Sequence, residues 1–185
     1  LHYYAANGVE AVGSPLPVVS IPANGSYSYD SQTLFGAAVV SYTVRLDSDV
    51  GIAATERVQF LQDTAALSAL SSADSGTEAY LSLIERDVTG AGRANSWSEV
   101  YVRNGGSAAT TVTVTYYNPN GSQQASQSQA IAARGFALFD TRSLSALGTA
   151  FQGYARVTQT GSQPLGVQWL AAQNQGTVLS GFSGL

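Results

Sequence analysis

The chain of 185 residues contains no cysteine, no methionine and no lysine, and it has a single histidine, His2. Without cysteine it can form neither disulfides nor cysteine-ligated metal sites, and it has no thiolate nucleophile. Without lysine it cannot form an internal Lys–Asn isopeptide cross-link. A histidine-based catalytic triad would have to use His2, which lies beside two tyrosines in an expected strand. We therefore expect no enzymatic activity and no cofactor.

Charge is also scarce. Charged residues make up 11% of the chain, the net charge is -4 and the pI is near 4.7. The basic residues are scattered arginines, whereas nucleic-acid binding needs a clustered basic face, so we expect no nucleic-acid partner. No apolar run is long enough to span a membrane. Because an initiator methionine is missing, we expect that Leu1 is not a translation start and that a secretion signal was removed upstream.

Apolar and polar residues alternate with a period of two almost throughout the chain, which indicates β-strands. Residues 111–116, 97–102 and 151–158 are the clearest cases. Turn residues such as Asn-Gly separate these strands at the spacing typical of β-sandwiches. Helix is expected only at residues 64–72 and in a turn over residues 141–146, with Asp140 as a possible N-cap. Residues 87–95 are expected to form a glycine-rich loop.

Four groups of residues recur in the same order about 112 residues apart, as from Tyr42 to Tyr154. A repeat of this kind indicates an array of like modules, which are more often scaffolds than catalysts. We expect Tyr3 and Tyr116, Tyr42 and Tyr154, and Gly36 and Gly148 to superpose. The matched positions are residues 2–4 and 115–117, with Tyr3 matching Tyr116; Asn7 and Asn120; Gly8 and Gly121; Ile21 and Ile131; Gly25 and Gly135; Tyr29 and Phe139; Asp30 and Asp140; Gly36 and Gly148; Tyr42 and Tyr154; and residues 50–52 and 165–167.

The two copies are unequal, because about 35 residues (79–113) precede the second copy's first anchor and have no counterpart in the first. A small, polar stretch at residues 71–76 has linker composition. We therefore expect an incomplete β-sandwich over residues 1–73, the first module, and a complete one with a C-terminal tail strand over residues 74–185, the second module. Both are expected to be antiparallel and all-β, with the opening strands missing from the first.

Three stretches of the second module are distinctive: AYLSLIERD (79–87), YVRNGGSAATTVTVTYYNPNG (101–121), and the closing GYARV (153–157) with QPLGV (163–167). Together they resemble the immunoglobulin-like β-sandwich repeats that occur in tandem in secreted bacterial cell-surface proteins. The resemblance implies an extracellular structural or adhesive role and brings no catalytic residues with it.

The sequence contains few other candidate binding or modification sites, and each leaves alternatives open. Asp47 and Asp49 with Glu56 could offer oxygen ligands to calcium, or could cap a polar turn. Asn24 and Asn120 both satisfy the glycosylation sequon, although each also fits a tight turn. The tyrosines could stack on sugars, but their recurrence favours core or cross-strand positions. If Tyr154 is a core residue, its truncation to alanine should cost about 3 kcal/mol.

The incomplete first module suggests assembly, because an open sandwich exposes sheet edges and core. We expect a structural subunit of an extracellular filament, fibre or surface layer, secreted or at the cell surface, that binds copies of itself by inter-subunit strand complementation. The alternative is an adhesive or glycan-binding module of a larger surface protein. The C-terminal tail suits either insertion into a neighbour or the last strand of its own sandwich. The candidate donor residues are Thr177, Val178, Leu179, Phe182 and Leu185, and the candidate acceptor residues are Tyr3, Val39, Val40, Tyr42, Val44 and Leu46.

Overall fold

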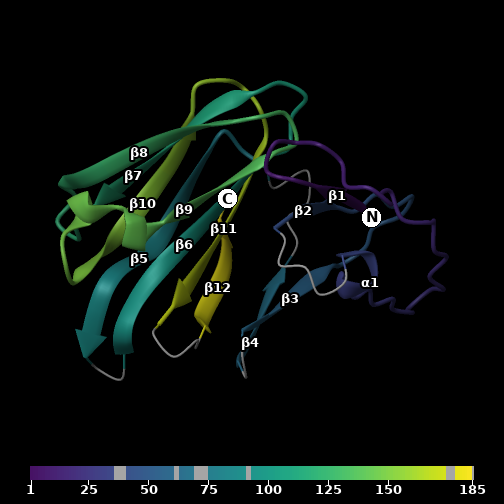
Figure 1. Ribbon diagram of the computed structural model, residues 1–185, viewed down its shortest axis with the longest axis horizontal. Coiled ribbons are helices and arrows are strands. Elements are labelled where there is room, and N and C mark those ends of the chain that lie inside the picture. The colour runs from purple at the N-terminus through teal and green to yellow at the C-terminus, as the bar shows by residue number, and fades with distance from the viewer. Residues whose placement is uncertain (36–40, 61–62, 69–74, 91–92, 174–177, 185) are drawn as a thin grey trace.

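The computed structural model describes residues 1–35, 41–60, 63–68, 75–90, 93–173 and 178–184 (Figure 1), and for residues 32, 56–60, 63–68, 93 and 178–184 it describes the backbone alone. Antiparallel strands dominate these ranges. The helical elements among them are single short turns: α1 (Gln32–Phe35), η2 (Thr141–Ser143) and η3 (Ser145–Leu147). The expectation of an all-β chain is confirmed. Within the same ranges, no helix is long and apolar enough to cross a membrane.

Eight strands of the second module form one sheet. Their spatial order is β12-β11-β6-β5-β10-β7-β8, and β9 pairs with β6 off this path, so that β5 and β6 are its central strands. The strands are β5 (Glu78–Gly90), β6 (Arg93–Asn104), β7 (Thr110–Tyr117), β8 (Gln123–Ile131), β9 (Phe136–Asp140), β10 (Phe151–Gln159), β11 (Leu165–Ala172) and β12 (Val178–Gly184).

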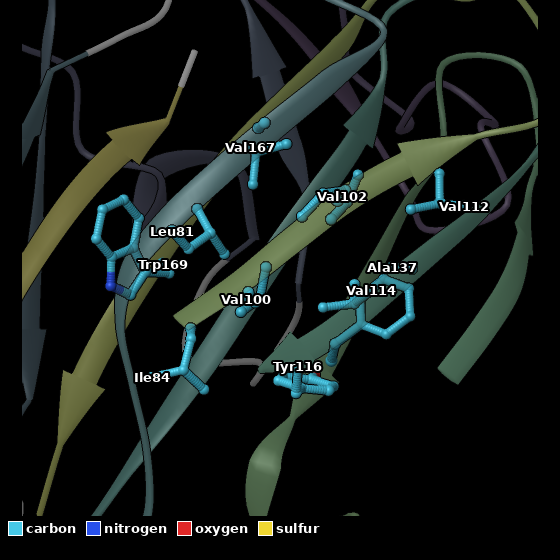
Figure 2. Close-up of a cluster of buried hydrophobic side chains, with 14 of the residues drawn as sticks. Leu81, Ile84, Val100, Val102, Val112, Val114, Tyr116, Ala137, Val167 and Trp169 are labelled. Carbon is cyan, nitrogen blue, oxygen red and sulfur yellow. The ribbon is translucent and has the colours of Figure 1, made fainter. Parts of the chain in front are cut away.

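The sheet folds over on itself because β5 changes partner along its length. Its first part, from Glu78 to Arg86, pairs with β10, and its last part, from Arg86 to Gly90, pairs with β6. Side chains from both halves of the sheet therefore meet in one core, as Figure 2 shows for Val100 on β6 and Val114 on β7. The result is sandwich-like, with β5 and β6 shared by both layers.

The strands follow the sequence pattern closely. Along β7 the residues alternate between buried and partly exposed, as the β-branched run at residues 111–116 predicts. β7 is joined to β8 by the predicted turn, in which Gly121 has φ 87° and donates its N–H to the carbonyl of Asn118 at 2.9 Å. The predicted strands at residues 97–102 and 151–158 lie within β6 and β10. The N-cap is also confirmed, since the side chain of Asp140 accepts from the N–H of Arg142.

In the first module the strands form two separate sheets of two strands each. β1 (His2–Tyr4) pairs with β2 (Thr43–Arg45), and β3 (Thr55–Phe60) pairs with β4 (Asp63–Ser68). The hairpin β3–β4 lies beside the second module, with β4 next to β12 (Figure 1). Between β1 and α1 the chain is largely irregular.

Two expectations about secondary structure are wrong. Residues 63–68 form β4 rather than the start of a helix, because pairing with β3 outweighs the helix propensity of a short Ala- and Leu-rich run; residues 69–72 lie outside the described residues. Residues 87–95 are not simply a loop either, since β5 runs on to Gly90 and β6 begins at Arg93. Register shifts between these strands accommodate the turn-forming residues, including Asp87 at φ 53°.

Candidate functional site

Some elements of the first module resemble elements in the second half of the second module. Strand pair β1–β2 resembles β7–β10, and hairpin β3–β4 resembles β11–β12. In both modules a helical turn follows an aspartate: α1 follows Asp30, and η2 follows Asp140. These elements occur in the same order along the chain, whereas β8, β9 and η3 have no counterpart among the described residues, so the tandem repeat stays a prediction. The boundary at residues 71–74 lies outside the described residues.

Among its described residues, the first module has no strands that correspond to the central pair β5 and β6. Removing β5 and β6 from the order β12-β11-β6-β5-β10-β7-β8 would leave two pieces, β12-β11 and β10-β7-β8. The sheets β4-β3 and β2-β1 match β12-β11 and β10-β7, and β8 and β9 also have no counterpart among the described residues. The strands that join the two halves of the second module's sheet are thus among those without a match in the first.

The strand pairing corrects the expected equivalence of Tyr42 and Tyr154 by one residue. In the second module Tyr116 lies opposite Ala155, whereas in the first its counterpart Tyr3 lies opposite Val44. Val44 thus takes the place of Ala155, and Thr43 takes that of Tyr154. The one-residue shift keeps apolar side chains on the same face of the strand, because side chains alternate with a period of two. The pair formed by Gly36 and Gly148 cannot be compared, since Gly36 lies outside the described residues.

Four apolar positions differ sharply in burial between the modules: two are matched by this register, and two, which precede β3, are matched by the sequence repeat of residues 50–52 and 165–167. In the second module they are at most 4% exposed, and in the first they are between 37% and 67% exposed. The strands that cover them in the second module are absent from the first, so surface that belongs to a core faces solvent. The first-module residues are Val44, Leu46, Val50 and Ile52, and their counterparts are Ala155, Val157, Leu165 and Val167. We call the first four the open-core residues.

Exposed apolar surface is concentrated in this part of the chain. Among the described residues, twelve large apolar side chains are exposed, and ten of them lie between Val9 and Ile52. Soluble proteins expose single apolar residues routinely, but a concentration of them marks an interaction surface. Of the other predicted acceptor residues, Tyr3 is buried against Phe35 and Tyr29, and Tyr42 stacks on Phe35 at 4.3 Å. Val39 and Val40 lie outside the described residues.

The edge of β2 that faces away from β1 accepts a hydrogen bond from a side chain and does not pair with another described strand. We call it the free edge of β2. The N–H of Tyr3 donates to Ser14 Oγ and its carbonyl accepts from Ala11, so both point away from β2. Tyr3 and Val44 are therefore a non-hydrogen-bonded pair, and the polar backbone groups of Val44 point to the opposite edge. There the carbonyl of Val44 accepts from Arg103 Nη1 at 3.0 Å. Burial lowers the pKa of the Arg103 guanidinium.

Arg103 also helps to fix the first module against the second. The buried ring of Tyr4 contacts the guanidinium groups of Arg103 and Arg134, whose centres are 5.9 and 6.0 Å from the ring centroid. The N–H of Phe136 donates to the carbonyl of Ala6. This contact was not predicted, because nothing in the local sequence links residues about 100 positions apart. Cation–π contacts of this kind contribute roughly 0.5–2 kcal/mol each.

His2 takes part in an ion-pair network rather than a catalytic triad. Its Nδ1 lies 2.8 Å from Glu10 Oε1, and its Nε2 lies 3.1 Å from Asp47 Oδ2. The hydroxyl of Ser14 donates to Glu10. A catalytic triad would instead need the serine hydroxyl to donate to the histidine, so that the histidine could remove its proton.

The carboxylates of this network have shifted pKa values. Hydrogen bonds from Ser14 and then from His2 lower the pKa of Glu10, and the hydrogen bond from Arg45 lowers the pKa of Asp47. Asp47 is thus engaged by Arg45 and His2, and no cluster of metal-binding side chains occurs in the described part of the chain.

The C-terminal tail pairs with its own chain. In β12, the backbone of Gly181 lies opposite Leu170 of β11, and that of Gly184 lies opposite Val167. Val178, Leu179 and Phe182 therefore belong to the last strand of their own sheet, which is one of the two alternatives that the sequence left open. Thr177 and Leu185 lie outside the described residues.

The outer face formed by β5, β10 and β7 presents three tyrosines. Tyr154 and Tyr117 stack with centroids 5.1 Å apart, and Tyr80 is exposed, with the guanidinium of Arg156 5.8 Å from its ring centroid. Arg156 in turn forms an ion pair with Glu78. Tyr154 is therefore a cross-strand residue on an outer face and not a core residue.

Both sequon asparagines are exposed, as a glycosylation acceptor must be. Asn24 has φ 60°, and the side chain of Asn120 accepts from the N–H and hydroxyl of Ser122 in the turn that follows β7. Both therefore also fit the tight turns that the sequence offered as the alternative.

Comparisons with known proteins give little further information. No family model matches the chain, and no curated protein matches it. One solved structure is similar, described as the crystal structure of Thermotoga maritima 1070. It is 10% identical, the similarity covers 60% of this chain and 95% of that one, and the TM-score is 0.49.

Proposed function

We propose that the protein is a structural subunit of an extracellular filament, fibre or surface layer, whose units are joined head to tail by β-strand complementation. The observation that carries this proposal is the state of the first module. It has two open sheets and exposes residues whose counterparts in the second module are core. In strand complementation, main-chain pairing provides affinity and pockets for alternate side chains provide specificity. The open-core residues and the free edge of β2 offer both.

A structural role also accounts for how the polar side chains are used. His2 contacts both Glu10 and Asp47, and Arg142 is held by Asp140 and by Glu99 at 3.0 Å. Arg142 also lies 4.3 Å from the ring centroid of Trp97. These contacts connect strands to turns, which suits a structural module better than a reaction site.

The tail is not the donor in this proposal. Since β12 pairs with β11 within the chain, withdrawing it would expose an edge of the second module while filling one in the first. The complementing strands must therefore come from a unit that precedes the first module in the head-to-tail array.

Electron microscopy and light scattering test the proposal. Purified protein is expected to form fibres or ordered assemblies in negative stain, with a mass above that of the monomer in size-exclusion chromatography with light scattering. A monomer at all accessible concentrations would contradict it.

A second function, glycan binding, is favoured by the outer face that carries Tyr80, Tyr117 and Tyr154. Exposed aromatic rings stack on the C–H faces of sugars, and Arg156 and Glu78 beside them can hydrogen-bond to hydroxyl groups. Retention of the protein on a glycan array, lost in a Tyr80→Ala variant, would support this function. The matched control is Leu138→Ala, which also truncates an exposed side chain but on β9.

A further inference from the structure

We propose that Arg103 keeps the free edge of β2 closed, and that it must leave this edge before a strand of a second copy can pair there. This inference rests on the proposed function and states how the assembly site is regulated. Three observations carry it: the contact between Arg103 and Val44, the incomplete hydrogen bonding of the guanidinium group, and an open strand edge elsewhere in the chain.

Arg103 occupies a position that a pairing strand needs. Val44 directs its backbone groups away from β1, and its carbonyl accepts from Arg103 Nη1 at 3.0 Å. In an antiparallel ladder this carbonyl would accept from an N–H of the next strand instead. Charged side chains at sheet edges are a common means of preventing edge-to-edge association. We call the contact between Arg103 and the Val44 carbonyl the Arg103 latch.

The latch is held weakly enough to open. Arg103 is half-buried, burial lowers its pKa, and its Nε is buried without a hydrogen-bond partner among the described residues. When a strand takes the Val44 carbonyl, the guanidinium group returns to water and recovers its hydrogen bonds. One hydrogen bond is thus exchanged for another while a desolvated charge is relieved, so opening the latch has no large cost.

Other contacts hold the first module in place when the latch opens. The N–H of Phe136 donates to the carbonyl of Ala6 at 3.2 Å. A side chain at Gly8 would clash with the carbonyl of Ala133, so the two modules approach backbone to backbone at this point. Opening the latch therefore frees the edge of β2 while these contacts persist.

A second copy can supply a strand without unfolding. β8 ends the order of the eight-stranded sheet and contains neither a charged residue nor a proline. The N–H of Thr160 donates to the carbonyl of Thr111, so the backbone groups of Thr111 point towards β10. Those of Ala130, its partner in β8, therefore point away from β7 to the open side of the strand. β8 of a second copy is thus the strand that displaces Arg103, through a heterologous contact.

Two substitutions remove the latch, and a matched control leaves it in place. Arg103→Met keeps the length of the side chain, whereas Arg103→Thr suits a strand and exposes less apolar surface. The control is Arg134→Met. The guanidinium centres of Arg103 and Arg134 lie 5.9 and 6.0 Å from the ring centroid of Tyr4, but the hydrogen bond to Val44 comes from Arg103. Circular dichroism checks that each variant is folded.

Sedimentation velocity over a concentration series measures association. If a charged hydrogen bond keeps the latch closed in about nine molecules of ten, its removal raises the apparent affinity about tenfold. We expect both Arg103 variants to associate at about one tenth of the concentration that the unsubstituted protein needs, and Arg134→Met to match the unsubstituted protein. In the assemblies, hydrogen exchange should slow at residues 43–45 and 123–131, where β2 and β8 pair.

Each other result overturns the inference. Association of the Arg103 variants at an unchanged concentration would show that Arg103 does not close the edge. An equal gain in Arg134→Met would show that loss of a contact with Tyr4 is sufficient, and tighter association without slower exchange in β2 and β8 would place the contact on another surface. Absence of association in the unsubstituted protein and in every variant would overturn the proposed function as well, so the two failures are distinguishable.

Discussion

At the scale of single residues, neighbouring tyrosines on the same strand have opposite roles. Tyr116 is fully buried, and its hydroxyl accepts from Gln127 Nε2 at 2.7 Å; burial raises its pKa to about 12. The next residue, Tyr117, points to the outer face, where it stacks on Tyr154. Alternation along β7 and β10, and not residue type, decides which ring supports the core.

Tyrosine truncations should therefore separate core from surface. We expect Tyr154→Ala to lower the free energy of unfolding by about 1 kcal/mol, because it removes one cross-strand aromatic pair. Tyr116→Ala, which leaves a cavity, should cost about 3–5 kcal/mol. Urea denaturation of both variants measures the difference. Equal losses would mean that Tyr154 is a core residue, as recurrence in the sequence allowed.

The network around His2 should respond to acid. The folded-state pKa values of Glu10 and Asp47 are lowered, from ordinary values of 4.5 and 3.8. The stability contributed by two such carboxylates is complete above those ordinary values and is lost as the pH falls through the lowered ones. We expect NMR titration of the carboxyl carbons to give midpoints below 4.5 for Glu10 and below 3.8 for Asp47.

A matched variant tests the cause of this shift. Ser14→Ala removes the hydroxyl that donates to Glu10 and leaves His2 in place, so the midpoint of Glu10 should rise while that of Asp47 stays nearly unchanged. The network is partly exposed, so added salt should weaken the remaining shift. A midpoint for Glu10 at its ordinary value in the unsubstituted protein would show that the network does not form in solution.

At the scale of elements, Thr141 anchors both central strands of the second module. Its hydroxyl donates to the carbonyl of Glu85 on β5 at 2.7 Å, and its oxygen accepts from the N–H of Ser98 on β6 at 3.0 Å. All three residues are fully buried. The turn η2 thus holds β5 and β6 near the place where the sheet folds over.

Thr141→Val keeps the shape of the side chain and removes these hydrogen bonds. We expect it to lower the free energy of unfolding by about 1–3 kcal/mol, because buried backbone groups lose their partner. The control is Thr113→Val on the outer face, where the hydroxyl contacts Ser128, and its effect should stay within about 0.5 kcal/mol. Chemical denaturation followed by circular dichroism compares the two variants. Similar small effects would exclude the anchoring role.

The sequence predicts elements well where the pattern is local. Alternation identifies β7 and β10, the Asn-Gly turn identifies the connection after β7, and Asp140 identifies the start of η2. The sequence-based prediction fails where long-range pairing determines the secondary structure. Residues 63–68 have a composition that predicts helix, but they pair with β3 as a strand. The candidate site was foreseen in part, since the repeat showed that about 35 residues were missing. That these residues form the two central strands became evident only from the sheet order.

At the scale of the whole molecule, the two modules differ in how far their sheets are complete among the described residues. The second module encloses its core, and the first module leaves the counterparts of that core exposed. The asymmetry predicts that the first module drives association while the second is independent of it. Substitutions at the open-core residues should therefore change assembly without changing the stability of the second module.

Val50→Glu combined with Ile52→Glu tests this separation. Each substitution places a carboxylate where a neighbour's strand must cover the surface, and burying an unpaired charge is strongly unfavourable. We expect sedimentation velocity to show loss of self-association, while near-ultraviolet circular dichroism from Trp97 and Trp169 stays unchanged. The control is Val12→Glu, which adds a charge at a side chain that is already 97% exposed and is not one of the open-core residues.

The control decides between a specific site and general stickiness. If apolar surface alone drove association, Val12→Glu would weaken it as much as a substitution at Val50, because both remove an exposed valine. Under strand complementation, only positions that a new sheet would cover are sensitive. Full association of the Val50 and Ile52 double variant would therefore contradict complementation at this site. An equal loss of association in the Val12 variant would show that the first module associates through non-specific apolar contacts.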